Sequence, residues 1–293
     1  MLPRRHIRIK VFQTLYTYTQ QEDNSKFNIK EAFKNNLSAY QKLYQLIITL
    51  IFFIKQTARE EIAANKKKFL ATSKDLNPNQ KFVKNQIFKS IREQPVDIDK
   101  NKLKSIAKKI FRDFKKSNSY KEYMAAEESS YEIDKKIIIF LLKKHIVNNP
   151  KIDEFLEENS IYWNDDLIIV YNTFIEKINN QTTINTTKAF RAKEDELFAK
   201  NLLQNTIKNE SGISKTIYQL ADNWDKDRIA LIDLILMRMA ISEMIHIKNI
   251  PHKVTLDEYI EISKYYSTPK SKEFINGVLD VFIKDILLKN KME

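Results

Sequence analysis

The chain has 293 residues, of which only two are glycine and none is cysteine. Without cysteine, disulfides, thiolate zinc sites and cysteine nucleophiles are excluded, and a reducing compartment is the natural setting. Glycine builds tight hairpins and phosphate-cradling loops, so its scarcity argues for helices and against Rossmann and P-loop enzymes. The length favours two domains over one.

The formal net charge of +12 is concentrated in one stretch of the chain. Residues 64–116 hold 16 Lys or Arg against 5 Asp or Glu, a net charge of +11. A basic block of this density is typical of a surface that faces a polyanion, RNA above all. The alternative is a compositional bias toward lysine in a chain that is also rich in Ile and Asn.

No targeting, membrane or metal signal stands out. The longest apolar run, 46–54, is too short to span a bilayer. The first 21 residues lack a continuous apolar core, which argues against a secretory signal and leaves a transit peptide as the minor alternative. The four histidines form no ligand-spaced pair such as HExxH. We therefore expect a soluble, cytoplasmic protein with no metal or cofactor.

The first predicted element is an amphipathic helix over 5–20. Three of the nine arginines, Arg4, Arg5 and Arg8, fall within the first eight residues. Their spacing of three and four residues allows all three to share one exposed side of that helix. Arginine offers a planar fork of donors that matches phosphates and base edges, so this cluster is a candidate nucleic-acid contact. The buried stripe consists of Ile7, Val11, Leu15 and Tyr18.

The rest of the chain also predicts helices, with a polar boundary near 185–190. We expect an N-terminal helical domain over 1–190, enlarged by a lysine-rich middle, and a C-terminal helical bundle over 191–293. Asp99 and Asn164 are the predicted N-caps of two middle helices, and Thr255 with Glu258 forms a predicted capping box. The predicted helices are 37–55, 101–116, 120–147, 164–180, 193–209, 213–223, 226–247, 256–266 and 272–288.

Two features of the sequence predict how the C-terminal bundle packs. The segment 226–247 is apolar on nearly every face, which predicts a central helix surrounded by others. Gly277 lies inside the last predicted helix, where glycine costs about 1 kcal/mol relative to alanine. We therefore expect another element, a neighbouring helix or a partner, to approach the backbone at Gly277.

Several segments together resemble the NusB transcription antitermination family. The resemblance spans roughly 3–20 and 195–288, and it implies an all-α fold of NusB-like helical bundles in two subdomains. About 170 residues between these regions exceed the usual family length. The segments that carry it are RRHIR at 4–8, QTLY at 13–16, RIALIDLILMRMAISEMIHI at 228–247, IPHKV at 250–254 and STPKSKEFINGVLD at 267–280.

What the resemblance implies is an RNA-binding and protein-binding adaptor with no catalytic centre. In this family the N-terminal arginine-rich motif binds the single-stranded boxA RNA element, and the start of the last helix contributes to the same face. The family pairs with NusE, a small-subunit ribosomal protein, in the RNA polymerase antitermination complex that acts in ribosomal RNA synthesis. Carried over by motif, the RNA-binding residues are Arg4, Arg5, His6, Arg8, Lys270, Ser271, Lys272, Phe274 and Asn276.

Two of these residues, Lys270 and Phe274, need separate comment. Lys270 replaces the acidic residue typical of its position, and Phe274 is more readily a core residue than a base-stacking one. We expect the two cationic chain ends to converge in space. Replacing Arg5 or Arg8 with alanine should then weaken RNA binding and leave stability nearly unchanged.

Two rival functions remain open from the sequence. One is a helical scaffold that binds proteins but not RNA, in which charge only keeps the surface soluble. The other is the accessory domain of an RNA cytosine methyltransferase, which would need a cysteine nucleophile and a Gly-rich cofactor loop. The chain contains neither of these enzyme features.

Overall fold

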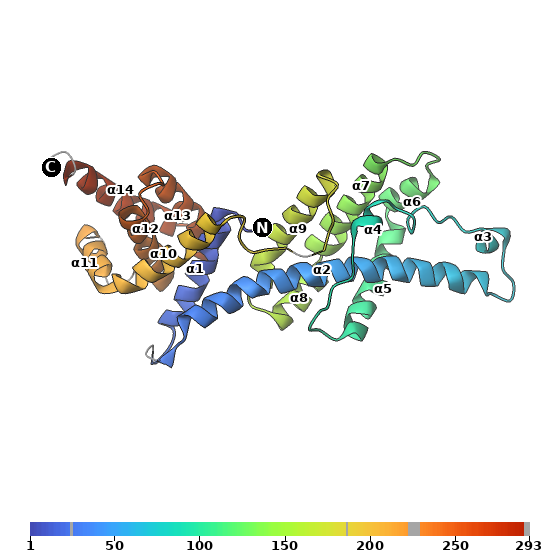
Figure 1. The fold of residues 1–293 in the computed structure, drawn as a ribbon, viewed down its shortest axis with the longest axis horizontal. Helices are drawn as coiled ribbons and strands as arrows, with labels where there is room; N and C mark the ends of the chain where they lie inside the picture. The colour runs from blue at the N-terminus through green and yellow to red at the C-terminus, as the bar shows by residue number, and fades with distance from the viewer. Residues whose placement is uncertain (24–25, 186, 222–228, 290–293) are drawn as a thin grey trace. The chain divides into compact units, whose positions relative to one another are not determined.

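The computed structural model describes residues 1–23, 26–185, 187–221 and 229–289. Every regular element among them is a helix, apart from one isolated bridge between Ile91 and Ile184, which confirms the all-α prediction (Figure 1). The chain divides into two compact units, and each is described by itself. Unit 1 comprises Met1 and Leu37–Ala189, and unit 2 comprises Leu2–Asn36 and Phe190–Glu293.

Unit 2 is organised around α12, whose nearly continuous apolar sequence requires burial on all sides. Packed against α12 are α1, α10, α11, α13 and α14. Leu236, Met237, Met239 and Ala240 are completely buried, so the predicted central helix is present from residue 231 onward. Residues 226–228 of that prediction lie outside the described residues. The helices of unit 2 are α1 (Arg4–Thr19), the start of α2 (Ile29–Lys66), α10 (Lys193–Lys208), α11 (Glu210–Leu220), α12 (Leu231–His246), α13 (His252–Tyr266) and α14 (Ser271–Lys289).

The division of the chain differs from the predicted domains at the N-terminus. We expected residues 1–190 to form one domain, but Leu2–Asn36 groups with the C-terminal helices. The reason is that α1 packs against α10, α12 and α13. The second break falls between Ala189 and Phe190.

Unit 1 contains the long middle of the chain. Its core includes the fully buried Tyr40 and Phe174 and a group of aromatic rings around Phe82, which lies 5.5 Å from Phe114 and 5.6 Å from Tyr120 between ring centroids. Its elements are the rest of α2, α3 (Ser73–Leu76), α4 (Ile87–Ser90), α5 (Lys100–Lys116), α6 (Asn118–Ala125), α7 (Tyr131–Phe140), the π-helix η2 (Leu141–Val147), α8 (Pro150–Asn159) and α9 (Trp163–Asn179).

Helix α5 has the N-cap and the apolar stripe that its sequence predicts. Asp99 is its N-cap, and an Asp99 carboxylate oxygen accepts a hydrogen bond from the Asn101 amide at 2.8 Å, as predicted. The apolar positions recur at helical spacing and form one buried stripe. Basic side chains cover the opposite side. The buried residues of α5 are Leu103, Ala107, Ile110, Phe111 and Phe114.

Several predicted boundaries in the chain are wrong. The helix expected over 120–147 is broken after Ala125 and continues as α7 and η2, and α8, which begins at Pro150, was not predicted. Asn164 lies inside α9 rather than capping it. Helix α13 begins at His252, and the predicted capping-box residues Thr255 and Glu258 make tertiary contacts instead.

Helix α2 is long and apolar enough to cross a membrane by length and composition. Of its most apolar stretch of 18 residues, 67% is buried inside the protein. Tyr40, Leu43, Ile48 and Ile54 are each completely buried. Such burial is typical of the core helix of a soluble protein.

Candidate nucleic-acid interface

Helix α1 carries the predicted arginines at its first turns. It begins at Arg4, directly after Pro3, and neither a side-chain cap nor an acidic residue in the first turn neutralises its N-terminal end. Backbone N–H groups at a helix start favour anions. Arg4 and Arg5 are exposed there, with 42% and 44% of their side-chain surfaces accessible. Two cations therefore stand on the solvent side of an anion-favouring helix end.

Arg8 is not part of that exposed surface. Arg8 is only 2% exposed. Its guanidinium forms a bidentate ion pair with Glu243 of α12, in which Nε donates to Oε2 at 2.9 Å and Nη2 donates to Oε1 at 2.6 Å. Thr255 and Tyr259 of α13 donate further hydrogen bonds to the same carboxylate at 2.9 and 3.0 Å. The prediction that all three arginines share one exposed side is wrong for Arg8.

The buried pair is electrostatically self-consistent. Burial opposes the charge of Arg8, but its hydrogen bonds to Glu243 and the surrounding negative charge outweigh burial and raise the pKa of Arg8. Burial and the neighbouring carboxylate raise the pKa of Tyr259 well above its ordinary value, so its hydroxyl stays a donor. Each Glu243 oxygen thus accepts one arginine and one hydroxyl hydrogen bond.

The two exposed arginines are also paired with acids of unit 2. Arg5 donates two hydrogen bonds of 2.9 Å to Glu258, and this interaction raises the pKa of Arg5. Arg4 donates to Asp195 at 3.2 Å, and its guanidinium lies 5.4 Å from the ring centre of Phe198. Because these pairs lie at the solvent-exposed surface, they contribute little to stability, and their carboxylates can be exchanged for other anions.

The start of α14 divides in the same way into exposed and buried residues. Lys270, Lys272 and Asn276 are exposed, whereas Ser271 is 4% and Phe274 7% exposed. Phe274 is therefore a core residue, as the sequence favoured. The Ser271 hydroxyl shares hydrogen bonds with Ser267 at 2.8 Å and Thr268 at 2.9 Å, which orders the turn before α14. His6 of α1 is likewise buried, at 4%.

The two ends of the chain are brought into one unit. Phe12 of α1 packs against Tyr266 at the end of α13, with 5.1 Å between ring centroids, and Lys270 follows Tyr266 by four residues. Helix α13 in turn packs against α14. Both cationic regions thus belong to the same bundle.

Gly277 has no close neighbour among the residues of unit 2 that the structure describes. A Cβ atom built there meets no atom within 4 Å, and the position is exposed. The expectation of a neighbouring helix at this backbone is therefore wrong. The outward position of Gly277 on α14 leaves its face open.

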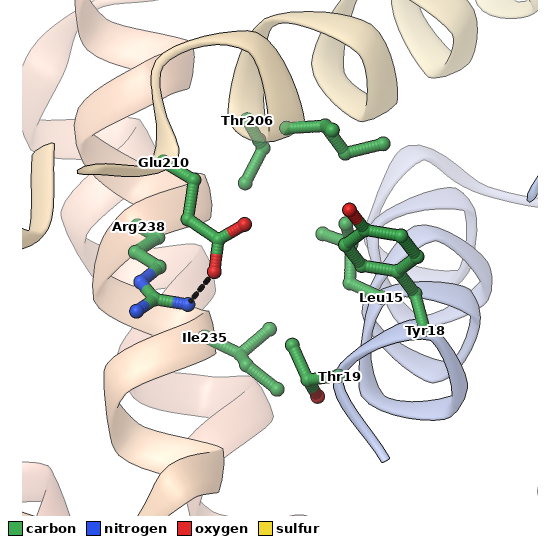
Figure 2. A pocket seen from close by; sticks show the side chains of 8 residues that line it. Leu15, Tyr18, Thr19, Thr206, Glu210, Ile235 and Arg238 are labelled. Atoms are coloured by element: carbon green, nitrogen blue, oxygen red, sulfur yellow. Dashed lines mark hydrogen bonds and ion pairs between the residues drawn. The ribbon is translucent and has the colours of Figure 1, made fainter. Parts of the chain in front are cut away.

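A small recess between α1, α10, α12 and the start of α11 is a poorer candidate for an RNA site (Figure 2). Its lining includes Leu15, Tyr18 and Ile235, and the only cation among its lining residues is Arg238. The Arg238 guanidinium donates to Glu210 at 2.6 Å, as Figure 2 shows. A mostly apolar recess whose cation is already paired offers little to a phosphate.

Sequence reasoning missed the acids that hold the arginines. The pairing of Glu243 could have been predicted from the sequence, because a carboxylate inside a helix that is apolar on nearly every face must have a partner. Asp195 lies in an ordinary polar stretch, and the local pattern of Glu258 predicted a capping box, so neither residue indicated a pairing with arginine. Among the described residues, no group of three His, Cys, Asp or Glu side chains could hold a metal ion.

Comparison with known proteins shows which family this chain resembles. A model of the NusB family matches residues 164–284. Relatives titled transcription antitermination protein NusB include those of Salinibacter ruber, 45% identical over 89 residues (30% of this chain, 56% of the relative), and Chloroherpeton thalassium, 42% identical over 92 residues (31% and 44%). The chain thus spans about half the length of these relatives.

A relative from Listeria welshimeri with the same title is 34% identical over 103 residues, which is 35% of this chain and 80% of the relative. No solved structure matches the chain significantly. Since a relative above 30% identity is matched over most of its length, the chain belongs to the NusB family.

Proposed function

We propose that the protein is a non-enzymatic transcription antitermination factor that binds boxA-like single-stranded RNA through unit 2. It would act with NusE, a small-subunit ribosomal protein, in the RNA polymerase antitermination complex during ribosomal RNA synthesis. The observation that carries the proposal is the exposed pair Arg4 and Arg5 at an uncapped helix start, in a chain related to proteins titled as antitermination factors.

Burial sorts the predicted site residues into two roles. The RNA contacts are the exposed Arg4, Arg5, Lys270, Lys272 and Asn276. The buried His6, Arg8, Ser271 and Phe274 support the surface from beneath. Phosphates and base edges of an unstacked strand are natural partners for the exposed group.

The pairs of Arg4 with Asp195 and of Arg5 with Glu258 are compatible with this role. Exposed ion pairs contribute only about 0–1 kcal/mol, so an RNA phosphate can replace a carboxylate at low cost. The uncapped start of α1 adds backbone donors and the positive end of the helix dipole. RNA would then meet pre-positioned arginines rather than mobile ones.

The test compares boxA-like RNA with a scrambled RNA of equal length by fluorescence anisotropy. The double variant Arg4→Ala/Arg5→Ala should bind boxA-like RNA at least about tenfold more weakly, since each charge-assisted hydrogen bond contributes about 1.5–3 kcal/mol. The matched control is Lys30→Ala/Lys34→Ala, two exposed lysines of the same unit. Equal affinity of both double variants would refute the site.

Protein pairing is tested separately. Tagged full-length protein, incubated with purified NusE from the same cells, should retain it in a pull-down with and without RNase. Retention of NusE together with no preference for boxA-like RNA would favour the rival function, a protein-binding scaffold.

A further inference from the structure

Most of the net positive charge of the protein lies in residues 64–116 of unit 1. Outside 64–116 the chain holds 34 of its 50 basic and 33 of its 38 acidic residues, so those regions are almost neutral. A general bias toward lysine would raise the positive charge everywhere. The confinement of the excess to one stretch needs another explanation.

Helix α5 displays the densest part of this charge. Its 17 residues include eight basic side chains and a single acidic one, Asp113. Lys104, Lys108, Arg112 and Lys116 are spaced four residues apart and form one row about 18 Å long, with Lys109 beside it. Lys104, Lys108, Lys109, Arg112 and Lys116 are all exposed.

Most of these lysines have no acidic partner. Within the described part of the chain, Lys108, Lys109 and Lys116 make no ion pair, and Lys104 contacts only the ring of Phe53, at 5.4 Å. Like charges four residues apart destabilise a helix by about 0.2–0.5 kcal/mol per pair. A bound polyanion would relieve this repulsion.

The chemistry of the surface favours RNA over the other acidic partners. A helix that lies on a membrane inserts an apolar face, but the apolar face of α5 is already buried against unit 1. Protein interfaces centre on aromatic residues and arginine and are depleted in lysine. A row of unpaired lysines instead matches a phosphate backbone, which is bound by charge without regard to sequence.

We propose that the lysine face of α5, defined by Lys104, Lys108, Lys109 and Lys116, is a second RNA-binding surface that holds the phosphate backbone without sequence preference. It goes beyond the proposed function, because it requires no recognition of boxA. Its role is to supply affinity and salt dependence, while unit 2 supplies sequence preference.

The test replaces the four lysines of this face with glutamine in the full-length chain. A matched variant makes the same charge change on four exposed lysines from four other helices, Lys42, Lys121, Lys151 and Lys215. The probe is a labelled 20-nucleotide oligouridylate, which has no boxA sequence, titrated from low to high salt by fluorescence anisotropy. Thermal unfolding of both variants checks that they are folded.

We expect the α5 variant to bind oligouridylate at least about tenfold more weakly at moderate salt. The slope of log affinity against log salt should become shallower by about 3, since each phosphate contact contributes roughly 0.7. The matched variant should change little. Equal losses in both variants, or binding to phosphatidylserine vesicles without binding to oligouridylate, would overturn the proposal.

The outcome is independent of the boxA proposal. The ratio of affinities for boxA-like and scrambled RNA measures the site of unit 2, and the α5 variant should lower both affinities equally. Loss of oligouridylate binding with an unchanged ratio supports the α5 surface whether or not that ratio exceeds one.

Discussion

Arg8 and Glu243 lie 235 residues apart in the sequence and form a buried ion pair with two hydrogen bonds. The pair joins the first helix of the chain to the central helix of unit 2. Thr255 and Tyr259 complete the hydrogen bonding of the carboxylate, so no part of the charge is left unsatisfied. This connection fixes α1, and with it the exposed Arg4 and Arg5, on the C-terminal bundle despite the long insertion between them.

Loss of Arg8 should therefore destabilise the protein. Arg8→Ala leaves Glu243 charged, buried and unpaired, and breaking a buried pair in this way costs about 3–5 kcal/mol. Arg5→Ala, which removes an exposed pair, should cost at most about 1 kcal/mol. Urea unfolding of the two variants measures the difference. Similar midpoints for both would show that the Arg8 pair is not structurally important.

The buried pair argues against the expectation from sequence that an Arg8 variant keeps its stability. Helical spacing places Arg8 on the same side as Arg4, but it cannot show how many helices pack around α1. Helix α1 contacts α10, α12 and α13, and Lys10 donates a hydrogen bond to Asn36 of α2 at 2.8 Å. As a result, even His6 and Lys10 are buried.

Local signals predicted well where local interactions decide the structure. The Asp99 cap of α5 and the apolar α12 follow from neighbouring residues, and both are observed. Thr255 and Glu258 had an equally clear local pattern, but their side chains bind Glu243 and Arg5 instead. Glu243 lies on the preceding helix, 12 residues from Thr255, and Arg5 lies 253 residues from Glu258. Partners on other helices leave no periodic trace in one sequence, so these tertiary contacts could not be predicted.

Stability should also depend on pH through His145. Burial beside Phe114 and Phe140 lowers the pKa of His145, although Asp113 acts in the opposite direction. As the pH falls through about 6.5, the unfolded chain takes up this proton more readily than the folded one, so the free energy of unfolding decreases. Above that pH, His145 does not change the free energy of unfolding.

Urea unfolding at pH 7.5 and 5.5 measures this effect. The wild-type protein should lose more stability between the two values than His145→Asn, in which the other three histidines are unchanged. An identical loss in both proteins would assign the pH dependence to other groups.

Glu258 should limit RNA affinity if RNA phosphates compete with it for Arg5. Glu258→Gln removes the competing charge and should tighten binding of boxA-like RNA by up to about fivefold, because an exposed ion pair contributes about 0.2–1 kcal/mol. Asp195→Asn is the matched change at Arg4. Weaker binding in Glu258→Gln would instead mean that Glu258 orients Arg5 for RNA.

Gly277 offers a test of the open face of α14. Because a Cβ atom at Gly277 meets nothing within 4 Å, Gly277→Ala should raise stability by about 0.5–1 kcal/mol through helix propensity alone. Gly212→Ala in α11, where the added Cβ also meets nothing, is the matched control and should give a similar gain in thermal unfolding. If Gly277→Ala alone also weakens retention of NusE in the pull-down, a partner approaches this backbone. Unchanged retention would mean that the exposed glycine plays no part in that pairing.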